Sequence, residues 1–260
     1  MKTASILLIG TGRAAHHIGS ALKRAGTDLI GVAGRDPERT RSLAERHGVR
    51  AFTLDALPTA DVILLAVSDD AIGAVAGHIP IGNGTVAHVS GARSLDLLGE
   101  HPQKGVLWPI QTLGPGPPID LSEVPLIVDG NTDRARHDLL ELAHAMSRKV
   151  LVLDQAQRER VHLAAVLTSN LPVFLAGEGR RLMEEQGLDP DVLLPLWKET
   201  AARVAVMGPK DALTGPARRG DRNTLAHHLR LLAHDPDLRT AYATLSEMIL
   251  RAYGNERNDR

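Results

Sequence analysis

Hydrophobic positions in the first 154 residues form short aliphatic runs that alternate with helical patterns. The runs are SILLI at residues 5–9, DLIGVAGRD at 28–36, DVILLAV at 61–67, TVAHV at 85–89, PLIV at 125–128 and VLVL at 150–153. Continuous apolar runs indicate strands buried on both faces, and helices between such strands indicate a parallel sheet. The pattern predicts an α/β fold with a doubly wound sheet over residues 1–154.

The pattern changes after Asp154, where long helical periodicities replace the strand-like runs. Helices are predicted over roughly 155–186, 190–207, 223–233 and 236–253. The segment between the second and third helices is rich in glycine, proline and charge, and such a long connection usually has a function. We therefore expect an all-α domain over residues 155–260.

The first of these helices carries polar residues within a small and apolar pattern. Residues seven apart lie only about 20° apart around a helix, so His162 and Ser169 share a stripe, with Asn170 beside them. Pro172 lacks the N–H that would bond to the Thr168 carbonyl, which predicts a kink. The stripe either faces a substrate, or consists of a satisfied core histidine and an asparagine that braces the kink.

A glycine-rich turn follows the first aliphatic run. Gly10, Gly12 and Ala15 match the pattern G-x-G-x-x-A, which allows a tight turn, close approach of a pyrophosphate and close packing of helix on sheet. The helix N-terminus then favours the phosphates. An ordinary glycine turn is the alternative, but the strand–turn–helix context predicts a dinucleotide-binding Rossmann domain. The other loop positions expected at the cofactor are Thr11, Arg13 and Ala14.

The end of the second run indicates which cofactor is bound. An NAD site would place an acidic residue there to bind the ribose 2′-hydroxyl, but this run ends in Gly34 and Arg35. A guanidinium suits a 2′-phosphate, and Arg13 could assist. The alternatives are solvated arginines, or Asp36 as a displaced ribose acid. We expect NADP(H).

Further cofactor or substrate contacts are expected where the later strands end, because ligands of such sheets bind beyond the carboxyl ends of the strands. Val67 and Ser68 follow one run, and Ser90 and Gly91 follow the next. Gln111 lies in the segment after the sequence GVLW. Each polar residue is individually as good a candidate for a turn or helix cap as for a contact.

Composition narrows the function class. The chain of 260 residues is 43% hydrophobic but only 2% aromatic, and its net charge is −1. These values argue against nucleic-acid and membrane-surface partners. The chain has no cysteine, so disulfides and thiolate metal sites are excluded, and we found no other set of metal ligands. No apolar run reaches the roughly 18 residues of a membrane span, and we expect a cytoplasmic protein.

Several motifs resemble a known family. They are ADVILLAVSDDAI, HVSGA, WPIQT, VHLAAVLTSNL, LLPLWKETA and ALTGPARRGDRNTLAHHL. Nearly the whole chain resembles Rossmann-like proteins whose C-terminal region is called domain of unknown function 2520. This group is similar to the pyrroline-carboxylate, ketopantoate and prephenate dehydrogenases and to deazaflavin-dependent NADP oxidoreductases. The resemblance implies an NADP domain followed by a helical dimerisation domain like the C-terminal domain of 6-phosphogluconate dehydrogenase.

The resemblance also implies site residues. It points to His162 and Asn170 in the first helix, with Ser169 beside them, and to a substrate loop. That loop comprises Thr214, Arg219 and Asp221, with Gln111 as a further contact. Relatives often have His or Tyr in place of Trp108, so we expect Trp108 to fill the core or form a wall of the cleft. The dehydrogenases often have a lysine where this chain has Val166, which leaves His162 as the candidate acid.

Two functions follow from these observations. The first is an NADP(H)-dependent oxidoreductase that acts on a small carbonyl, imine or hydroxy-acid substrate and works as a homodimer. Arg158, Arg218 and Arg219 would suit a carboxylate or phosphate on that substrate, unless they are surface charges. The second is a non-catalytic NADP(H) sensor or scaffold, which would need no polar cluster within a helix. The substrate, the direction of reaction and a deazaflavin as hydride acceptor stay open.

Overall fold

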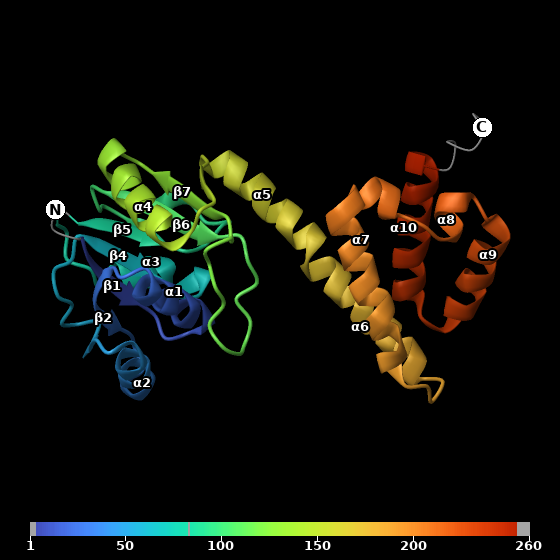
Figure 1. Cartoon of the computed structure of the whole chain (residues 1–260), viewed down its shortest axis with the longest axis horizontal. Helices are drawn as coiled ribbons and strands as arrows, with labels where there is room; N and C mark the ends of the chain where they lie inside the picture. The colour runs from blue at the N-terminus through green and yellow to red at the C-terminus, as the bar shows by residue number, and fades with distance from the viewer. Residues whose placement is uncertain (1–3, 83, 254–260) are drawn as a thin grey trace. The chain divides into compact units, whose positions relative to one another are not determined.

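The computed structural model describes residues 4–82 and 84–253. These residues form two compact units, which divide between Leu167 and Thr168 (Figure 1). The predicted domain boundary between residues 154 and 155 falls just before a helix, whereas the division by compactness falls inside that helix. Each unit is described by itself.

The first unit is built on an eight-stranded sheet in the order β3-β2-β1-β4-β5-β6-β7-β8. The strands are β1 (Ser5–Ile9), β2 (Asp28–Ala33), β3 (Arg50–Phe52), β4 (Val62–Leu65), β5 (Thr85–His88), β6 (Lys104–Pro109), β7 (Leu126–Gly130) and β8 (Val150–Val152). All neighbours are parallel except β6 and β7. The predicted doubly wound sheet is confirmed. Because β1, β4 and β5 are parallel, the loops after them meet at one edge.

Helices cover both faces of this sheet. They are α1 (Arg13–Arg24), α2 (Pro37–His47), η1 (Asp69–Ala71), α3 (Ile72–Ala76), η2 (Leu95–Leu98) and α4 (Asp133–Met146). Alternate residues of β1 serve two aliphatic cores: Ile6 and Leu8 pack with α1 and α4, whereas Leu7 and Ile9 pack with α3. Burial on both faces explains why the central strands read as unbroken aliphatic runs.

The helix α5 (Gln155–Thr168) follows β8. Asp154 and Gln157 form a reciprocal capping pair at its start, since each side chain accepts a hydrogen bond from the other's backbone N–H at 3.0 and 2.8 Å. The helical segment predicted over 155–186 has the break that the predicted kink implies, but at Ser169, which leaves helical geometry (φ −120°, ψ −61°) before α6 (Asn170–Glu184) begins. The break lies next to Thr168, whose carbonyl would clash with the Pro172 ring in a regular helix.

The second unit is helical throughout its described residues, as predicted, and is coloured from yellow to red in Figure 1. After α6 it contains η3 (Pro190–Leu193), α7 (Leu194–Ala212), α8 (Pro216–Arg219), α9 (Arg222–Leu231), η4 (Leu232–His234) and α10 (Pro236–Tyr253). Gly208 interrupts α7 with a φ of 80° just before Pro209.

One helical stretch, Gln155–Glu184, is long and apolar enough by length and composition alone to cross a membrane. The expectation that no segment reaches that length is therefore wrong. Its apolar window has a mean hydropathy of 1.2, and none of that window is buried. The same features suit a helix that is covered by another protein chain, so the stretch by itself does not indicate a membrane.

Candidate cofactor and active site

The glycine loop after β1 has the geometry that the sequence pattern predicts. Gly10 adopts a φ of 131°, and its N–H donates to the Ala33 carbonyl at 2.8 Å. A Cβ at this position would lie 2.2 Å from the Ala66 carbonyl oxygen, so only glycine fits. Gly12 is the N-cap of α1, and no atom lies within 4 Å of where its Cβ would be. The open space beside Gly12 leaves room for a pyrophosphate at the helix N-terminus.

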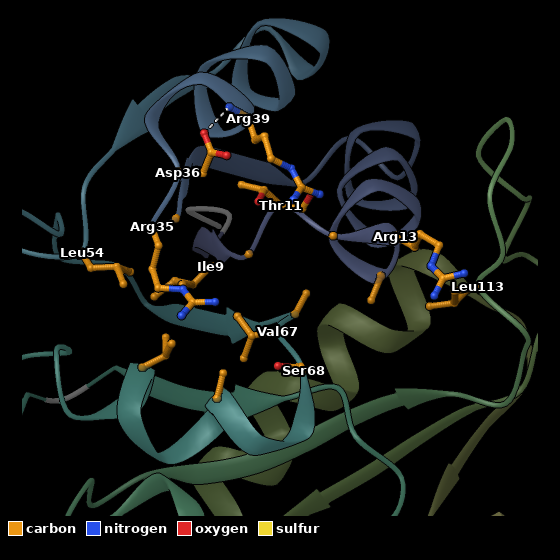
Figure 2. A pocket seen from close by; sticks show the side chains of 17 residues that line it. Ile9, Thr11, Arg13, Arg35, Asp36, Arg39, Leu54, Val67, Ser68 and Leu113 are labelled. Atoms are coloured by element: carbon orange, nitrogen blue, oxygen red, sulfur yellow. Dashed lines mark hydrogen bonds between the residues drawn. The ribbon is translucent and has the colours of Figure 1, made fainter.

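A cavity of about 820 Å³ lies at the carboxyl ends of β1, β2 and β4 (Figure 2). The predicted cofactor residues that line it are Gly10, Thr11, Gly12, Arg13, Ala14, Gly34, Arg35, Val67 and Ser68. Ala15 is fully buried behind the loop, as close packing of α1 on the sheet requires. Ser90 and Gly91 do not line this cavity and belong to the neighbouring loop after β5.

Three arginines line the cavity: Arg13, Arg35 and Arg39. Arg35 and Arg39 both line it, and in Figure 2 they lie on one side of Thr11 while Arg13 lies on the other. The Arg39 guanidinium also donates to the Thr11 carbonyl at 3.3 Å. Two guanidinium groups near the end of β2 fit the 2′-phosphate of NADP(H). Sequence reasoning missed Arg39, although a second arginine four residues after Arg35 was a usable signal.

Asp36, the alternative ribose ligand, also lines the cavity but serves as a helix cap. Its carboxylate caps α2 by accepting from the backbone N–H groups of Glu38 and Arg39 at 3.0 and 3.1 Å. Pro37 at the first helical position supports this cap.

A second group of side chains gathers around Trp108, near the carboxyl end of β6. The indole is only 9% exposed and packs so closely on Gly91 that a Cβ there would lie 2.4 Å from the ring. The half-buried His162 of α5 lies against it, with ring centroids 5.7 Å apart. Trp108 is thus core filling for the loop after β5 and also the surface on which the candidate acid rests.

Arg158 is neither a surface charge nor an exposed ligand of a substrate. Its side chain is fully buried, and its Nε donates to the Asp129 carboxylate at 3.1 Å. One of its terminal nitrogens, Nη1, donates to the carbonyls of Gly91 and Arg93, both at 3.1 Å. The sequence suggested that this arginine binds an anion, but its Nε and Nη1 donate to groups of the protein itself.

His88, the last residue of β5, is buried under this group. The Ser90 N–H donates to Nδ1 at 3.2 Å, so Nε2 carries the proton and faces the Ser94 carbonyl at 3.3 Å. Burial lowers the pKa of His88 from 6.5 to about 4, and the positive charge of Arg158 adds to this effect. The neutral ring therefore shapes the loop that contains Ser90 and Gly91.

Mild acid should destabilise the protein through His88. The unfolded chain, with the ordinary pKa of 6.5, binds the proton more readily than the folded chain does, with a pKa of about 4. The free energy of unfolding is therefore highest above the unfolded pKa of 6.5. It decreases as the pH falls from 6.5 to about 4, by at most about 3 kcal/mol. Urea unfolding of wild type and His88→Asn across this pH range checks this, because Asn keeps an acceptor for Ser90 but does not titrate. Equal pH slopes for the two proteins would contradict it.

The remaining predicted site residues do not all lie in the first unit. Gln111 does, and its side-chain oxygen accepts from the Thr112 N–H at 2.9 Å. In the second unit, Ser169 donates to the Asn170 side-chain oxygen at 3.0 Å at the start of α6. Since His162 belongs to the first unit, its proximity to Ser169 and Asn170 stays a prediction.

Contacts within the predicted substrate loop explain part of its conformation. Gly215 and Gly220 both adopt positive φ, at the start and end of α8. The Asp221 carboxylate caps α9 by accepting from the N–H and hydroxyl of Thr224 at 3.1 and 2.6 Å, and these hydrogen bonds lower its pKa. The exposed side chains in this loop are those of Thr214 and Arg219.

Arg218, the third arginine considered as an anion ligand, is also engaged within the second unit. It donates to the Tyr253 carbonyl at 2.7 Å, and its guanidinium lies 5.0 Å from the centroid of the Tyr253 ring. These contacts tie α8 to the end of α10, so packing explains this residue.

Comparison with known proteins places these features in a family. The model for the coenzyme F420-dependent NADP oxidoreductases matches residues 5–87, and the model for domain of unknown function 2520 matches residues 124–249. No curated protein matches the chain. Among solved structures, a protein of Bacteroides fragilis described as a candidate NADP oxidoreductase is 32% identical, with a TM-score of 0.84 over 95% of this chain and 98% of that one.

Two further structures extend the likeness. A protein of Thermotoga maritima is 26% identical, with a TM-score of 0.76 over 97% of this chain and 99% of that one. A pyrroline-5-carboxylate reductase of Coxiella burnetii shares the fold at 18% identity, with a TM-score of 0.58 over 95% and 99%. The chain therefore belongs to the family of NADP oxidoreductases that join a nucleotide-binding domain of the F420-dependent type to domain of unknown function 2520, and its cofactor is NADP(H).

Proposed function

We propose that this protein is an NADP(H)-dependent enzyme that reduces a small carbonyl or imine, or oxidises the corresponding hydroxy acid, with His162 as the proton donor or acceptor. The observation that carries the proposal is the imidazole of His162 held against Trp108 near the carboxyl end of β6. The cofactor cavity lies at the carboxyl ends of parallel strands in the same sheet. The pyrroline reductase with the same fold makes an imine one of the reasonable substrates.

The chemistry divides between cofactor and protein. When bound, NADPH supplies the hydride for reduction. The protein then has to give one proton to the carbonyl oxygen or imine nitrogen that gains charge, and an imidazole does this well near neutral pH. Asn170 would fix the substrate or the nicotinamide amide, with Ser169 holding the Asn170 side chain through their hydrogen bond. Thr214, Arg219 and Gln111 would contribute the substrate side of the site, and Asp221 would shape this loop by capping α9.

Replacing His162 with alanine should lower turnover by roughly 10²–10⁴-fold, the range for loss of a general acid, while the affinity for NADPH changes little. The measurement is NADPH consumption with 1-pyrroline-5-carboxylate and with pyruvate as probes. His137→Ala is the matched control, because His137 is an exposed histidine of α4 in the same unit. Unchanged turnover in His162→Ala would reject the acid role. If the wild type binds NADPH but consumes it with neither probe nor with a wider panel of small carbonyls and imines, the sensor function is favoured.

We also propose that the protein is a cytoplasmic homodimer assembled through its helical unit. That unit exposes many large apolar side chains, including Val173 (64%), Leu196 (65%) and Val206 (86%). Such a surface is more than a soluble monomer normally exposes, and a second copy would cover it. Light scattering at micromolar concentration should give twice the mass of one chain, and Leu196→Asp should lower that mass. A monomeric wild type would contradict the proposal.

A further inference from the structure

The helix α5 is attached to the sheet by very few side chains. Arg158 is the one α5 residue that is buried, while Val161 is partly buried against the cluster of Val106, Trp108 and Ile127. Beyond the capping pair at its start and the contact of His162 with Trp108, α5 is held to the sheet by Arg158 and Val161. A helix that packs through a single turn is free to tilt unless a directional contact holds it.

Arg158 supplies that directional contact. Its Nε donates to Asp129 of β7, and its Nη1 donates to the Gly91 and Arg93 carbonyls in the loop after β5. The planar guanidinium fixes the angle between these hydrogen bonds, so the second turn of α5 is held to two separate parts of the sheet. Within the described part of the chain, the buried Nη2 has no hydrogen-bond partner.

The loop that receives Arg158 is itself tied to the cofactor side of the sheet. The Arg93 side chain pairs with Asp69 at 3.1 Å and with Asp70 at 3.3 Å. These aspartates directly follow Ser68, which lines the cofactor cavity. Polar contacts thus run from the two residues after Ser68, through the loop after β5, to α5.

His162 lies one turn beyond Arg158 on the same face of α5, because residues four apart are neighbours on a helix. The geometry points to Arg158 as the positioning residue for His162: the buried guanidinium sets the rotation and tilt of α5, and this keeps the imidazole against Trp108 near the carboxyl end of β6. The inference rests on the proposed role of His162, but it concerns the position of the ring, which can be measured without a substrate.

Lysine cannot replace Arg158 in this role. A lysine keeps the positive charge beside Asp129, but its single ammonium lacks the planar fork that serves Asp129 and the two loop carbonyls in fixed directions. Arg158→Lys therefore tests the geometry of the side chain while the positive charge is kept. Arg160→Lys is the matched control, since Arg160 is an exposed arginine of the same helix.

The position of His162 can be read from Trp108 fluorescence. The chain has two tryptophans, and Trp197→Phe removes the other one. An imidazole in contact with an indole quenches its emission, so at a fixed neutral pH Trp108 emission should be higher in His162→Gln than in its parent. In the Trp197→Phe background, Arg158→Lys should lose most of this His162-dependent quenching, whereas Arg160→Lys should retain it. Thermal melts of each variant confirm that it is folded.

Each outcome decides the inference. Equal His162-dependent quenching in Arg158→Lys and in its parent would overturn it, and so would the absence of such quenching in the parent. Where Arg158→Lys is not folded, Asp129→Asn provides the same test, because it removes the carboxylate that orients the guanidinium but keeps the arginine.

Turnover provides a second readout. With a substrate that the wild type accepts, Arg158→Lys should lower kcat by roughly 10–100-fold, as expected for a misplaced catalytic group, without a matching change in the Kd of NADPH. A loss confined to the Kd of NADPH would contradict the inference. If His162→Ala leaves turnover unchanged, the proposed acid role fails, but the fluorescence comparison still shows whether Arg158 positions the ring.

Discussion

Gly10→Ala should destabilise the fold more than any other single change at the cofactor site. The added methyl group would lie 2.2 Å from the Ala66 carbonyl oxygen in the sheet, at a φ of 131° that alanine rarely adopts. Backbone strain of about 1–3 kcal/mol and a similar cost of overpacking together approach the whole stability of a small domain. Urea unfolding should therefore show a loss of several kcal/mol, or no cooperative transition.

Gly12→Ala is the control two residues away. No atom lies within 4 Å of its added Cβ, and its φ of −85° suits any residue, so folding should change by about 1 kcal/mol or less. The methyl group would instead occupy space where a pyrophosphate approaches the backbone, and NADPH affinity should fall by at least about tenfold, or 1.4 kcal/mol. Calorimetry that shows unchanged NADPH affinity in folded Gly12→Ala would mean that the pyrophosphate does not bind at this loop.

Arg35→Ala and Arg39→Ala should weaken NADPH binding without affecting NADH binding. Each guanidinium lines the cavity at the end of β2, and each charge-assisted hydrogen bond to the 2′-phosphate should contribute about 1–3 kcal/mol. The double variant should therefore bind the two cofactors with similar affinity. Because both side chains are exposed, the preference for NADPH should also diminish at high salt.

Arg41→Ala tests whether this effect is specific. Arg41 is an exposed arginine of the same helix, α2, but it does not line the cavity. Calorimetric titration of all four proteins with NADPH and NADH gives the comparison. Equal affinity of the wild type for the two cofactors, or an equal loss in Arg41→Ala, would show that general positive charge rather than these two guanidinium groups selects the cofactor.

The sequence by itself determined the features that depend on local pattern. The central strands β1, β4 and β5 are mostly aliphatic because each is buried on both faces. Such unbroken apolar runs predict a parallel sheet from the sequence pattern alone. The positions of Gly10, Gly12 and Ala15 follow from backbone and packing requirements that few other residues meet. The break before Pro172 was also expected, although its position at Ser169 was not.

Only the tertiary structure decided which polar side chains form hydrogen bonds within the protein. Asp36 and Asp221 looked like ligands in the sequence, but both cap helices, and Arg39 one turn into α2 lines the cavity. Arg158 looked like a surface charge or an anion ligand, yet it joins Gly91, Arg93 and Asp129 in the interior. These partners lie 29 to 67 residues away from it along the chain. No periodicity or spacing encodes such contacts, because burial and hydrogen-bond direction arise only when distant segments pack together.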